Sequence, residues 1–285
     1  MKKFPNRVPL LMFLAMFPLL LWGDGGVQLE GDLIQGGMVT GYVLPGTKVT
    51  FDDRPVRVSN EGIFLLGFGR DHPNSSQLKL SFPDGLSESR IVAVEKRDYK
   101  IQRIDGLPKR KVTPKKMDYE RIRKETALVK QARRRDDPRS DFLSGWIWPV
   151  EGPISGVYGS QRVLNGKPKR PHFGVDIARP VGTPVRAPAD GIVTLAHPDM
   201  FYSGATLIVD HGHHLSSSFL HLNRILVKQG ERVRRGQVIA EVGKSGRVTG
   251  PHLDWRMNLD RARIDPQRLV GPMPRQPVRL QAETQ

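Results

Sequence analysis

A run of alternating residues at 250–255 (GPHLDW) contains two side chains that could bind a metal ion. His252 and Asp254 are separated by one position, so on a half-buried strand they would share one face. The apolar Leu253 and Trp255 would occupy the opposite face. The chain has no cysteine, which leaves imidazole and carboxylate groups as the side-chain ligands for a metal. The run therefore predicts part of a metal site on a β scaffold.

A second candidate run, PHFGVD at 171–176, lies earlier in the chain. On a straight strand His172 and Asp176 would be about 13 Å apart, too far to share one ion. Gly174 between them offers a bend, and the neighbouring prolines and β-branched residues argue against a helix. Taken alone, this run also fits an ordinary surface pair. A shared site is favoured because His221, which closes an apolar strand, and the later run follow in the same β-rich region.

The elements that would position these residues are strands. From residue 146 onward, turns rich in glycine and proline separate runs rich in valine, isoleucine and leucine, and no segment has the length or period of a helix. The strand-length runs are 191–195, 206–210, 220–222 and 238–242. Together they predict a compact, mostly antiparallel β domain over 146–272.

Residues 146–272 resemble the M23 (LytM or lysostaphin-like) metallopeptidases. The resemblance rests on GSQR at 159–162, PHFGVD at 171–176, GTPVRAPADG at 182–191, SFLHL at 218–222 and GRVTGPHL at 246–253. It implies a zinc-dependent endopeptidase that hydrolyses peptide bonds of peptidoglycan. It also implies that His172 and Asp176 bind Zn²⁺, and that His221 and His252 act around the attacking water and the developing oxyanion.

The third zinc ligand of the family is the second histidine of an H-x-H motif, and this chain has Asp254 at that position. A carboxylate can bind Zn²⁺ at a distance similar to that of imidazole. However, one histidine and two carboxylates would cancel the formal charge of the ion and would suit harder divalent ions. Two functions remain open. One is an active hydrolase with Asp254 as third ligand to zinc or another divalent ion. The other is a catalytically inactive LytM-like domain that binds cell wall or activates a separate amidase.

Two regions precede the peptidase-like domain. Residues 24–98 hold short alternating runs between turn signals, for example at 38–43 and 48–51, which predict a small β-sandwich-like domain with no evident chemistry. Residues 99–145 are predicted to be a basic helical linker, with a helix over 118–135 that Pro138 ends.

Positive charge is concentrated in residues 96–139. This segment holds seventeen lysine and arginine residues against seven aspartate and glutamate residues, and so carries most of the net charge of +16. The excess predicts adhesion to an anionic envelope surface, and a solvated linker helix is an equal alternative. Nucleic acid is not expected as a partner, because aromatic residues do not interleave with the basic ones and the protein is predicted to be exported.

The amino terminus has the pattern of an export signal. Lys2, Lys3 and Arg7 precede an apolar run at 10–22 that is too short to span about 30 Å of hydrocarbon. The pattern predicts a signal peptide at 1–23 and a location in the periplasm or cell envelope, with an uncleaved anchor as the alternative. Residues 273–285 are predicted to be a flexible tail.

The remaining candidates have weaker patterns. His211, His213 and His214 cluster in a predicted hairpin turn and are expected to be exposed there. Arg162 and Lys169 flank the first run and are predicted to meet carboxylates of the substrate.

Overall fold

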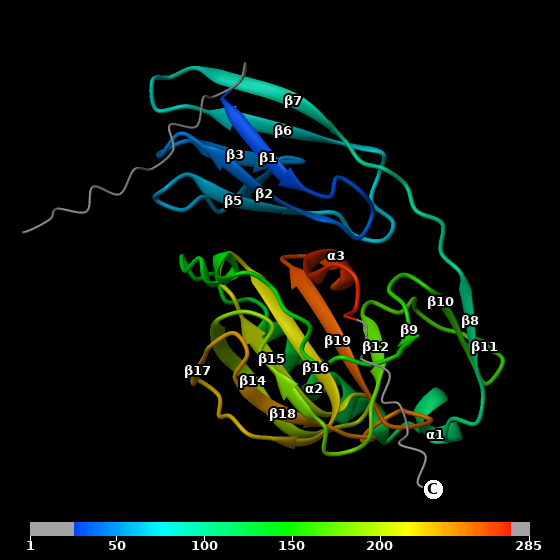
Figure 1. The fold of residues 1–285 in the computed structure, drawn as a ribbon. Coiled ribbons are helices and arrows are strands. Elements are labelled where there is room, and N and C mark those ends of the chain that lie inside the picture. The colour runs from blue at the N-terminus through cyan, green and yellow to red at the C-terminus, as the bar shows by residue number, and fades with distance from the viewer. Residues whose placement is uncertain (1–25, 275–285) are drawn as a thin grey trace, which may run out of the picture.

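The computed structural model of the protein describes residues 26–274. The predicted signal peptide at 1–23 and most of the predicted tail lie outside the described residues. Two β regions stack one above the other, and a connecting segment runs down one side (Figure 1). The prediction of a mostly β protein is confirmed. None of the helices within 26–274 is long and apolar enough to cross a membrane.

The amino-terminal β region is a pair of antiparallel sheets around one apolar core. Side chains alternate along β6 (Ser75–Ser81), where Leu78 and Leu80 are buried and their neighbours are more exposed. Both sheets contribute to this core, which is the packing of a β-sandwich. The sheets have the orders β1-β2-β5 and β4-β3-β6-β7. The other strands are β1 (Val27–Gly31), β2 (Met38–Val43), β3 (Lys48–Phe51), β4 (Arg54–Val56), β5 (Ile63–Gly67) and β7 (Ser87–Ala93).

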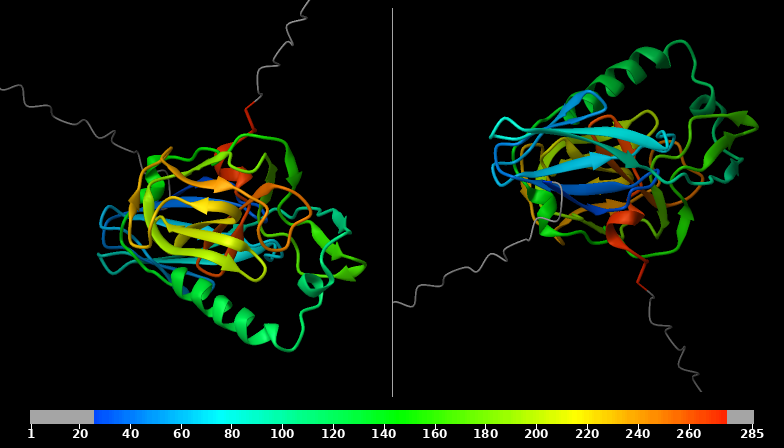
Figure 2. Two further views of the ribbon diagram at one scale, coloured as in Figure 1. Left: turned by 90° about the horizontal axis from the view of Figure 1, so that it is seen from below. Right: turned by 90° about the horizontal axis from the view of Figure 1, so that it is seen from above.

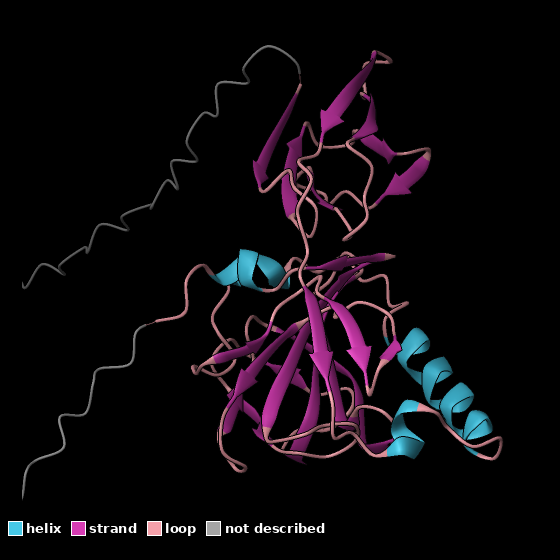
Figure 3. Cartoon of the chain, turned by 90° about the vertical axis from the view of Figure 1, so that its right-hand side faces the viewer, coloured by secondary structure: helices cyan, strands magenta, loops and turns pink. Residues whose placement is uncertain are grey.

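The segment between the two β regions, residues 96–145, is called the connector. It contains one long helix, α2 (Asp118–Ala132), which lies inside the predicted helix. Its Val129 and Ala132 pack on Leu195 and Ile208, so the helix is held along one flank of the carboxy-terminal sheet (Figures 2 and 3). Acidic residues stand in its first turn, where the helix dipole favours them. The shorter elements of the connector are β8 (Ile101–Ile104), α1 (Lys109–Val112) and the 3-10 helix η1 (Asp141–Ser144).

The connector differs in two ways from a free basic linker. It contains a strand, because β8 pairs in parallel with β10 (Gln161–Leu164), which also pairs with β11 (Lys167–Pro168). Many of its basic side chains also contact the rest of the protein. Examples of such contacts are Arg97 to Asp265, Lys111 to Phe201, Arg121 to Asp199, Arg133 to Ser218 and Arg139 to Asp210. The connector is therefore docked, which leaves less of its charge for an external surface.

The carboxy-terminal β region is built on a ten-stranded sheet. Its main order is β17-β14-β15-β16-β19-β12-β9, with β18 joining β16 to β13 and with β20 next to β19. All of its strand pairs are antiparallel, as predicted for this region. The remaining elements are β9 (Ile154–Gly156), β12 (Val175–Ala178), β13 (Pro184–Arg186), β14 (Gly191–Met200), β15 (Gly204–Asp210), β16 (Leu215–Ile225), β17 (Arg232–Val233), β18 (Val238–Val242), β19 (His252–Leu259), β20 (Ala262–Ile264) and α3 (Gln267–Val270).

The two β regions are packed together. Met38 and Leu65 of the amino-terminal region belong to the same core as Trp255 in the carboxy-terminal sheet. Arg97 donates a 2.9 Å hydrogen bond to Asp265, next to α3 at the junction between the two regions (Figure 1). The sheet that carries the candidate site is thus fixed from both the amino-terminal region and the connector.

Candidate metal centre

Two aspartates face each other across neighbouring strands of the carboxy-terminal sheet. Asp176 on β12 pairs directly with Asp254 on β19 in antiparallel register. Both side chains are buried. Like charges directly opposite each other destabilise a strand pair, and a buried charge without a partner adds a large desolvation cost. This register therefore requires positive charge next to the two carboxylates.

His172 completes a group of three metal-binding side chains. Its Nε2 lies 3.0 Å from Asp176 Oδ1 and 3.4 Å from Asp254 Oδ1, and the three ligand atoms lie within 4.8 Å of one another. Two atoms that each lie about 2.1 Å from a tetrahedral zinc ion are themselves about 3.4 Å apart. Among the described residues, His172 Nε2 and Asp176 Oδ1 are buried without a hydrogen-bond partner. An ion between these atoms would satisfy both, so the residues present fit a divalent metal.

The electrostatics of the group also favour a bound cation. Burial lowers the pKa of His172, but the attraction of Asp176 and Asp254 outweighs burial and raises it above the ordinary value. Burial raises the pKa of Asp254, yet Arg256 and His172 hold it well below its usual range. The group therefore contains ionised carboxylates that favour either a proton on His172 or a metal ion bound to it.

A bend at Gly174 brings His172 back toward Asp176, as the sequence predicted. Strand β12 begins only after this residue. A Cβ atom at position 174 would lie 2.7 Å from Asp254 Oδ1 and 2.5 Å from Arg256 Cγ, closer than real Cβ contacts. Glycine is needed here because the loop passes so close to β19.

Two more histidines border the group with their Nε2 atoms turned toward it. His221 Nε2 lies 4.0 Å from Asp254 Oδ2, and His252 Nε2 lies 3.8 Å from Asp176 Oδ1. The centroids of the two rings are 5.0 Å apart. The structure thus brings together all five residues that the sequence singled out, from β12, β16, β19 and the loop before β12.

The other ring nitrogen of each bordering histidine is held by a backbone carbonyl. His221 Nδ1 lies 2.8 Å from the Ser245 carbonyl oxygen, and His252 Nδ1 lies 2.9 Å from that of Gly250. A carbonyl can only accept, so Nδ1 of each ring is the donor, and in the neutral imidazole Nε2 has the free lone pair. Burial lowers the pKa of His221 to about 4, which keeps this imidazole neutral at neutral pH.

Sequence reasoning missed Arg256, which pairs with Asp254. Its Nε and Nη2 donate hydrogen bonds of 2.8 and 2.5 Å to the two oxygens of Asp254. Arg256 stands two positions after Asp254 on β19, so the same alternation that joined His252 to Asp254 could have found it. Arg162 donates a 2.6 Å bond to Asp176 Oδ2. These arginines offset the second carboxylate, so the expectation that two carboxylates cancel the charge of the ion has to be corrected.

The histidine cluster at 211–214 is not an exposed turn. The prediction of exposure is wrong for His211 and His213, which are both buried. Trp146, at the start of the carboxy-terminal region, and Phe142, near the end of the connector, pack edge-on against their rings at centroid distances of 5.1 and 5.2 Å. His214 is half-buried and lies 3.2 Å from Asp136. Within residues 26–274, the only group of three or more histidine or acidic residues with metal-ligand spacing is His172, Asp176 and Asp254.

Comparison with known proteins identifies the family. Residues 170–266 match the model of peptidase family M23, and this segment contains all five residues of the candidate centre. A solved structure of a putative peptidase M23 from Pseudomonas aeruginosa is 32% identical, with a TM-score of 0.64, and the match covers 84% of this chain and 94% of that chain. The chain belongs to peptidase family M23. The predicted family and fold are therefore confirmed.

Curated relatives match part of the chain. The peptidoglycan DD-endopeptidase ShyA of Vibrio cholerae is 38% identical over 147 residues, which are 49% of this chain and 33% of ShyA. The DD-carboxypeptidase/endopeptidase Mpg of Neisseria meningitidis is 39% identical over 105 residues, which are 37% of this chain and 24% of Mpg. The chain thus spans about a third or less of the length of these relatives.

Proposed function

We propose that this M23 protein is a zinc-dependent endopeptidase that hydrolyses peptide bonds of peptidoglycan. The observation that carries the proposal is the buried group of His172, Asp176 and Asp254, whose ligand atoms include two without any hydrogen-bond partner in the described chain. The names of the relatives ShyA and Mpg support a peptidase that acts on cell wall.

In this proposal the group of three residues holds the ion. Bound zinc would supply Lewis acidity, which polarises the scissile carbonyl group and makes water acidic enough to attack near neutral pH. Arg256 orients Asp254 through its two parallel hydrogen bonds. Such partners of ligating residues commonly set the geometry and basicity of the ligand.

His221 and His252 handle the protons of the reaction. Each has its Nε2 lone pair turned toward the group, so either can take a proton from the attacking water. Once protonated, the same nitrogen can donate to the oxyanion or to the leaving amine. The low pKa of His221, about 4, keeps it ready as an acceptor at neutral pH.

A second candidate is a catalytically inactive LytM-like domain that binds cell wall or activates a separate amidase. The observation that favours it is the pairing of Arg256 with both oxygens of Asp254. Each oxygen has already given one lone pair to a charge-assisted bond. Metal content separates the two candidates, because the inactive domain needs no ion.

The decisive experiment measures metal content and peptidoglycan hydrolysis of the purified protein. We expect about one bound metal ion per chain and release of soluble peptidoglycan fragments, and we expect Asp254→Ala to lose both. Asp210→Ala is the matched control, because Asp210 is another buried carboxylate of the sheet that pairs with an arginine outside the group. A metal-free, inactive protein that neither zinc nor manganese restores would overturn the endopeptidase proposal.

A histidine at position 254 is informative only together with a second change. Asp254→His alone would leave the half-buried Arg256 without its carboxylate, which is destabilising. Asp254→His combined with Arg256→Gln removes that charge and supplies the imidazole. We expect the double variant to bind zinc and to hydrolyse peptidoglycan. If the double variant loses metal and activity as fully as Asp254→Ala does, an imidazole at position 254 does not replace the carboxylate as a ligand.

Export and adhesion to an anionic envelope surface are also part of this proposal, and both rest on the sequence. The basic run before the apolar segment 10–22 supports a location in the periplasm or cell envelope. Finding the full-length chain in the cytosolic fraction of its own cells would contradict export. For adhesion, failure of the protein to sediment with anionic vesicles at low salt would contradict a role of the connector at such a surface.

A further inference from the structure

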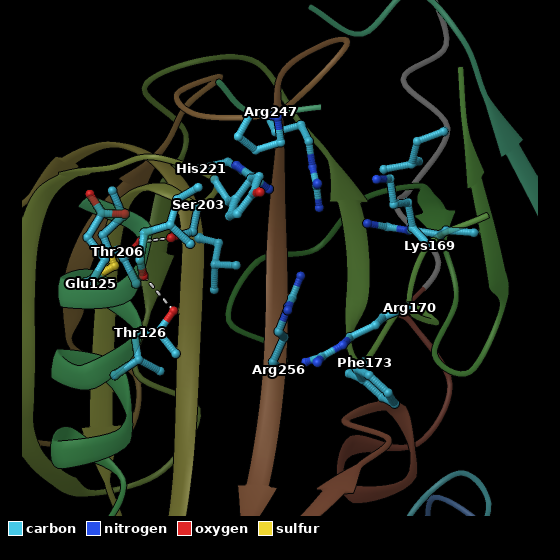
Figure 4. Close-up of a pocket in the computed structure, with 18 of the residues that line it drawn as sticks. Glu125, Thr126, Lys169, Arg170, Phe173, Ser203, Thr206, His221, Arg247 and Arg256 are labelled. Atoms are coloured by element: carbon cyan, nitrogen blue, oxygen red, sulfur yellow. Dashed lines mark hydrogen bonds between the residues drawn. The ribbon is translucent and has the colours of Figure 1, made fainter. Parts of the chain in front are cut away.

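A cavity of about 640 Å³ lies between the connector and the carboxy-terminal sheet. One wall is α2, which contributes Ile122 and Val129. His221 and Arg256 also line the cavity, so it opens directly onto the candidate metal centre (Figure 4). A peptide bound with its scissile bond at the metal centre would therefore extend into this cavity.

The cavity carries a large excess of positive charge. Beside Arg162 and Arg256, which pair with the aspartates of the metal centre, five further cations line it. These are Arg133, Lys169, Arg170, Arg247 and Arg263. None of the five forms an ion pair with any residue in 26–274.

The protein groups that do contact these cations are neutral. Arg133 donates a 2.9 Å bond to the Ser218 hydroxyl, and Arg263 donates a 2.8 Å bond to the Asn258 side chain. Glu125 is the one acidic residue among the described residues that line the cavity, and it is already paired within α2. The charge of the cavity is thus left without compensation by the protein.

Burial and mutual repulsion both lower the pKa values of cations in the cavity. Burial, together with the charges of Arg263 and Arg256, holds the pKa of Arg133 well below its usual range. Burial and the charge of Arg256 lower the pKa of Arg263 to about 10. By contrast, Arg139 at the other end of the sheet pairs with Asp137, Asp141 and Asp210. An anion in the cavity would supply the missing counter-charge.

We propose that this cavity binds free carboxylate groups of the peptide substrate and so makes the protein selective for acidic peptides of peptidoglycan. This inference rests on the proposed endopeptidase function and names the substrate class of the same site. Guanidinium groups bind carboxylates through paired hydrogen bonds. Apolar side chains of α2 beside them suit the aliphatic parts of such a peptide.

The test compares the binding of two forms of one ligand. The probes are a cross-linked peptide dimer released from peptidoglycan with its carboxyl groups free, and the same dimer with these groups converted to amides. Titration calorimetry on the metal-loaded His252→Ala protein, which keeps the three ligand residues, measures both affinities without rapid cleavage. We expect the free-acid dimer to bind about 10- to 100-fold more tightly, the effect of one good charge-assisted hydrogen bond or slightly more.

Variants of residues that line the cavity, each made in the His252→Ala protein, test whether the cavity causes the preference for the free-acid dimer. Arg133→Gln and Arg170→Gln are each expected to reduce the ratio of the two affinities by at least about threefold. In free energy this is roughly half of the tenfold effect of one charge-assisted hydrogen bond. Arg170 is exposed, so its variant is expected to fold even if Arg133→Gln does not. Arg123→Gln is the matched control, because Arg123 lies on α2 but is exposed and does not line the cavity.

Binding and hydrolysis separate this inference from the proposed function. Equal affinities for the two dimers, or a preference that Arg170→Gln leaves unchanged, would overturn the inference even if the wild-type protein hydrolyses peptidoglycan. A preference that the cavity variants reduce would support it even if hydrolysis is absent, and the endopeptidase proposal would then fail alone. Tighter binding of inorganic phosphate than of the free-acid dimer would also overturn it.

Discussion

Two fully buried imidazoles of the carboxy-terminal region, His172 and His211, have opposite surroundings. His211 lies with Nδ1 2.6 Å from the Asp190 carbonyl oxygen and Nε2 2.8 Å from the Ser217 hydroxyl. His172 has no hydrogen-bond partner at either nitrogen among the described residues, and two carboxylates lie beside its Nε2. Burial alone therefore does not mark a functional histidine, whereas the partners at its nitrogens do.

The pKa values follow the same division. Burial lowers the pKa of His211 to about 4, since its partners are neutral and the charged form is not stabilised. The pKa of His172 is raised in spite of burial because its neighbours are ionised carboxylates. We infer that His211, in its neutral form, stabilises the fold, and that His172 binds a cation. The predictions below test this contrast.

The largest effect is expected from His172→Ala. Loss of one of three ligands should remove the bound metal and lower peptidoglycan hydrolysis by more than about 100-fold, because even partners outside the ligand set contribute 10- to 100-fold. Metal analysis and release of soluble fragments measure the two effects. In the matched variant His211→Ala, the metal content of the folded fraction should stay at the wild-type level. Loss of metal from folded His211→Ala would break the contrast between the two histidines.

The second prediction concerns acid stability. His211 has its ordinary pKa of 6.5 when unfolded and about 4 when folded, so the unfolded chain binds an extra proton between these values. The free energy of unfolding should therefore decrease as the pH falls from 6.5 to 4, by about 3 kcal/mol from this residue, and should not change further on its account below pH 4. Urea unfolding at several pH values measures the slope.

The control for this slope is His211→Gln, which cannot take up a proton. It should be less stable than the wild-type protein at pH 7 but should have a shallower dependence on pH. His221, whose pKa is also lowered to about 4 by burial, accounts for part of the slope that remains. If His211→Gln and the wild-type protein lose stability in parallel between pH 6.5 and 4, His211 is not a neutral buried residue.

The features that could be predicted from the sequence are those that depend on the pattern of residues within one short segment. The limits of β2 and β18 agree with the alternating or apolar runs at 38–43 and 238–242. The five candidate residues were found because they belong to short motifs on neighbouring strands and on the loop before β12. Arg256 follows the same alternation and was missed only because a basic residue does not bind a metal.

Other features depend on contacts between distant segments. The strand β8 was not expected, because its polar sequence forms a strand only by pairing with β10. The burial of His211 and His213 was missed because Trp146 and Phe142, from the segment where the connector meets the sheet, cover them. The charged cavity likewise exists only because α2 docks on the sheet. Periodicity within a segment gives no information on such docking.

The third prediction is a loss of activity in Arg256→Gln. Without the guanidinium, Asp254 loses the two hydrogen bonds that orient it, and kcat should fall by about 10- to 100-fold while metal remains bound. This separates the ligands from the residues that orient them, because His172→Ala should lose the metal itself. An Arg256→Gln protein with wild-type kcat would mean that Asp254 needs no such support. The difference between His172 and His211 would then depend only on the two carboxylates beside His172.

The smallest effect is expected from His214→Ala. His214 belongs to the same turn as His211, but it is half-buried, and among residues 26–274 its one charged partner within 4 Å is Asp136, at 3.2 Å. Partly exposed pairs of this kind contribute little, so the free energy of unfolding should change by about 0.5 kcal/mol or less, with no change in metal content. A loss above about 2 kcal/mol would show that the turn histidines act as one packed unit. His214 would then stabilise the fold as His211 does, although it lacks the two hydrogen bonds that distinguish His211.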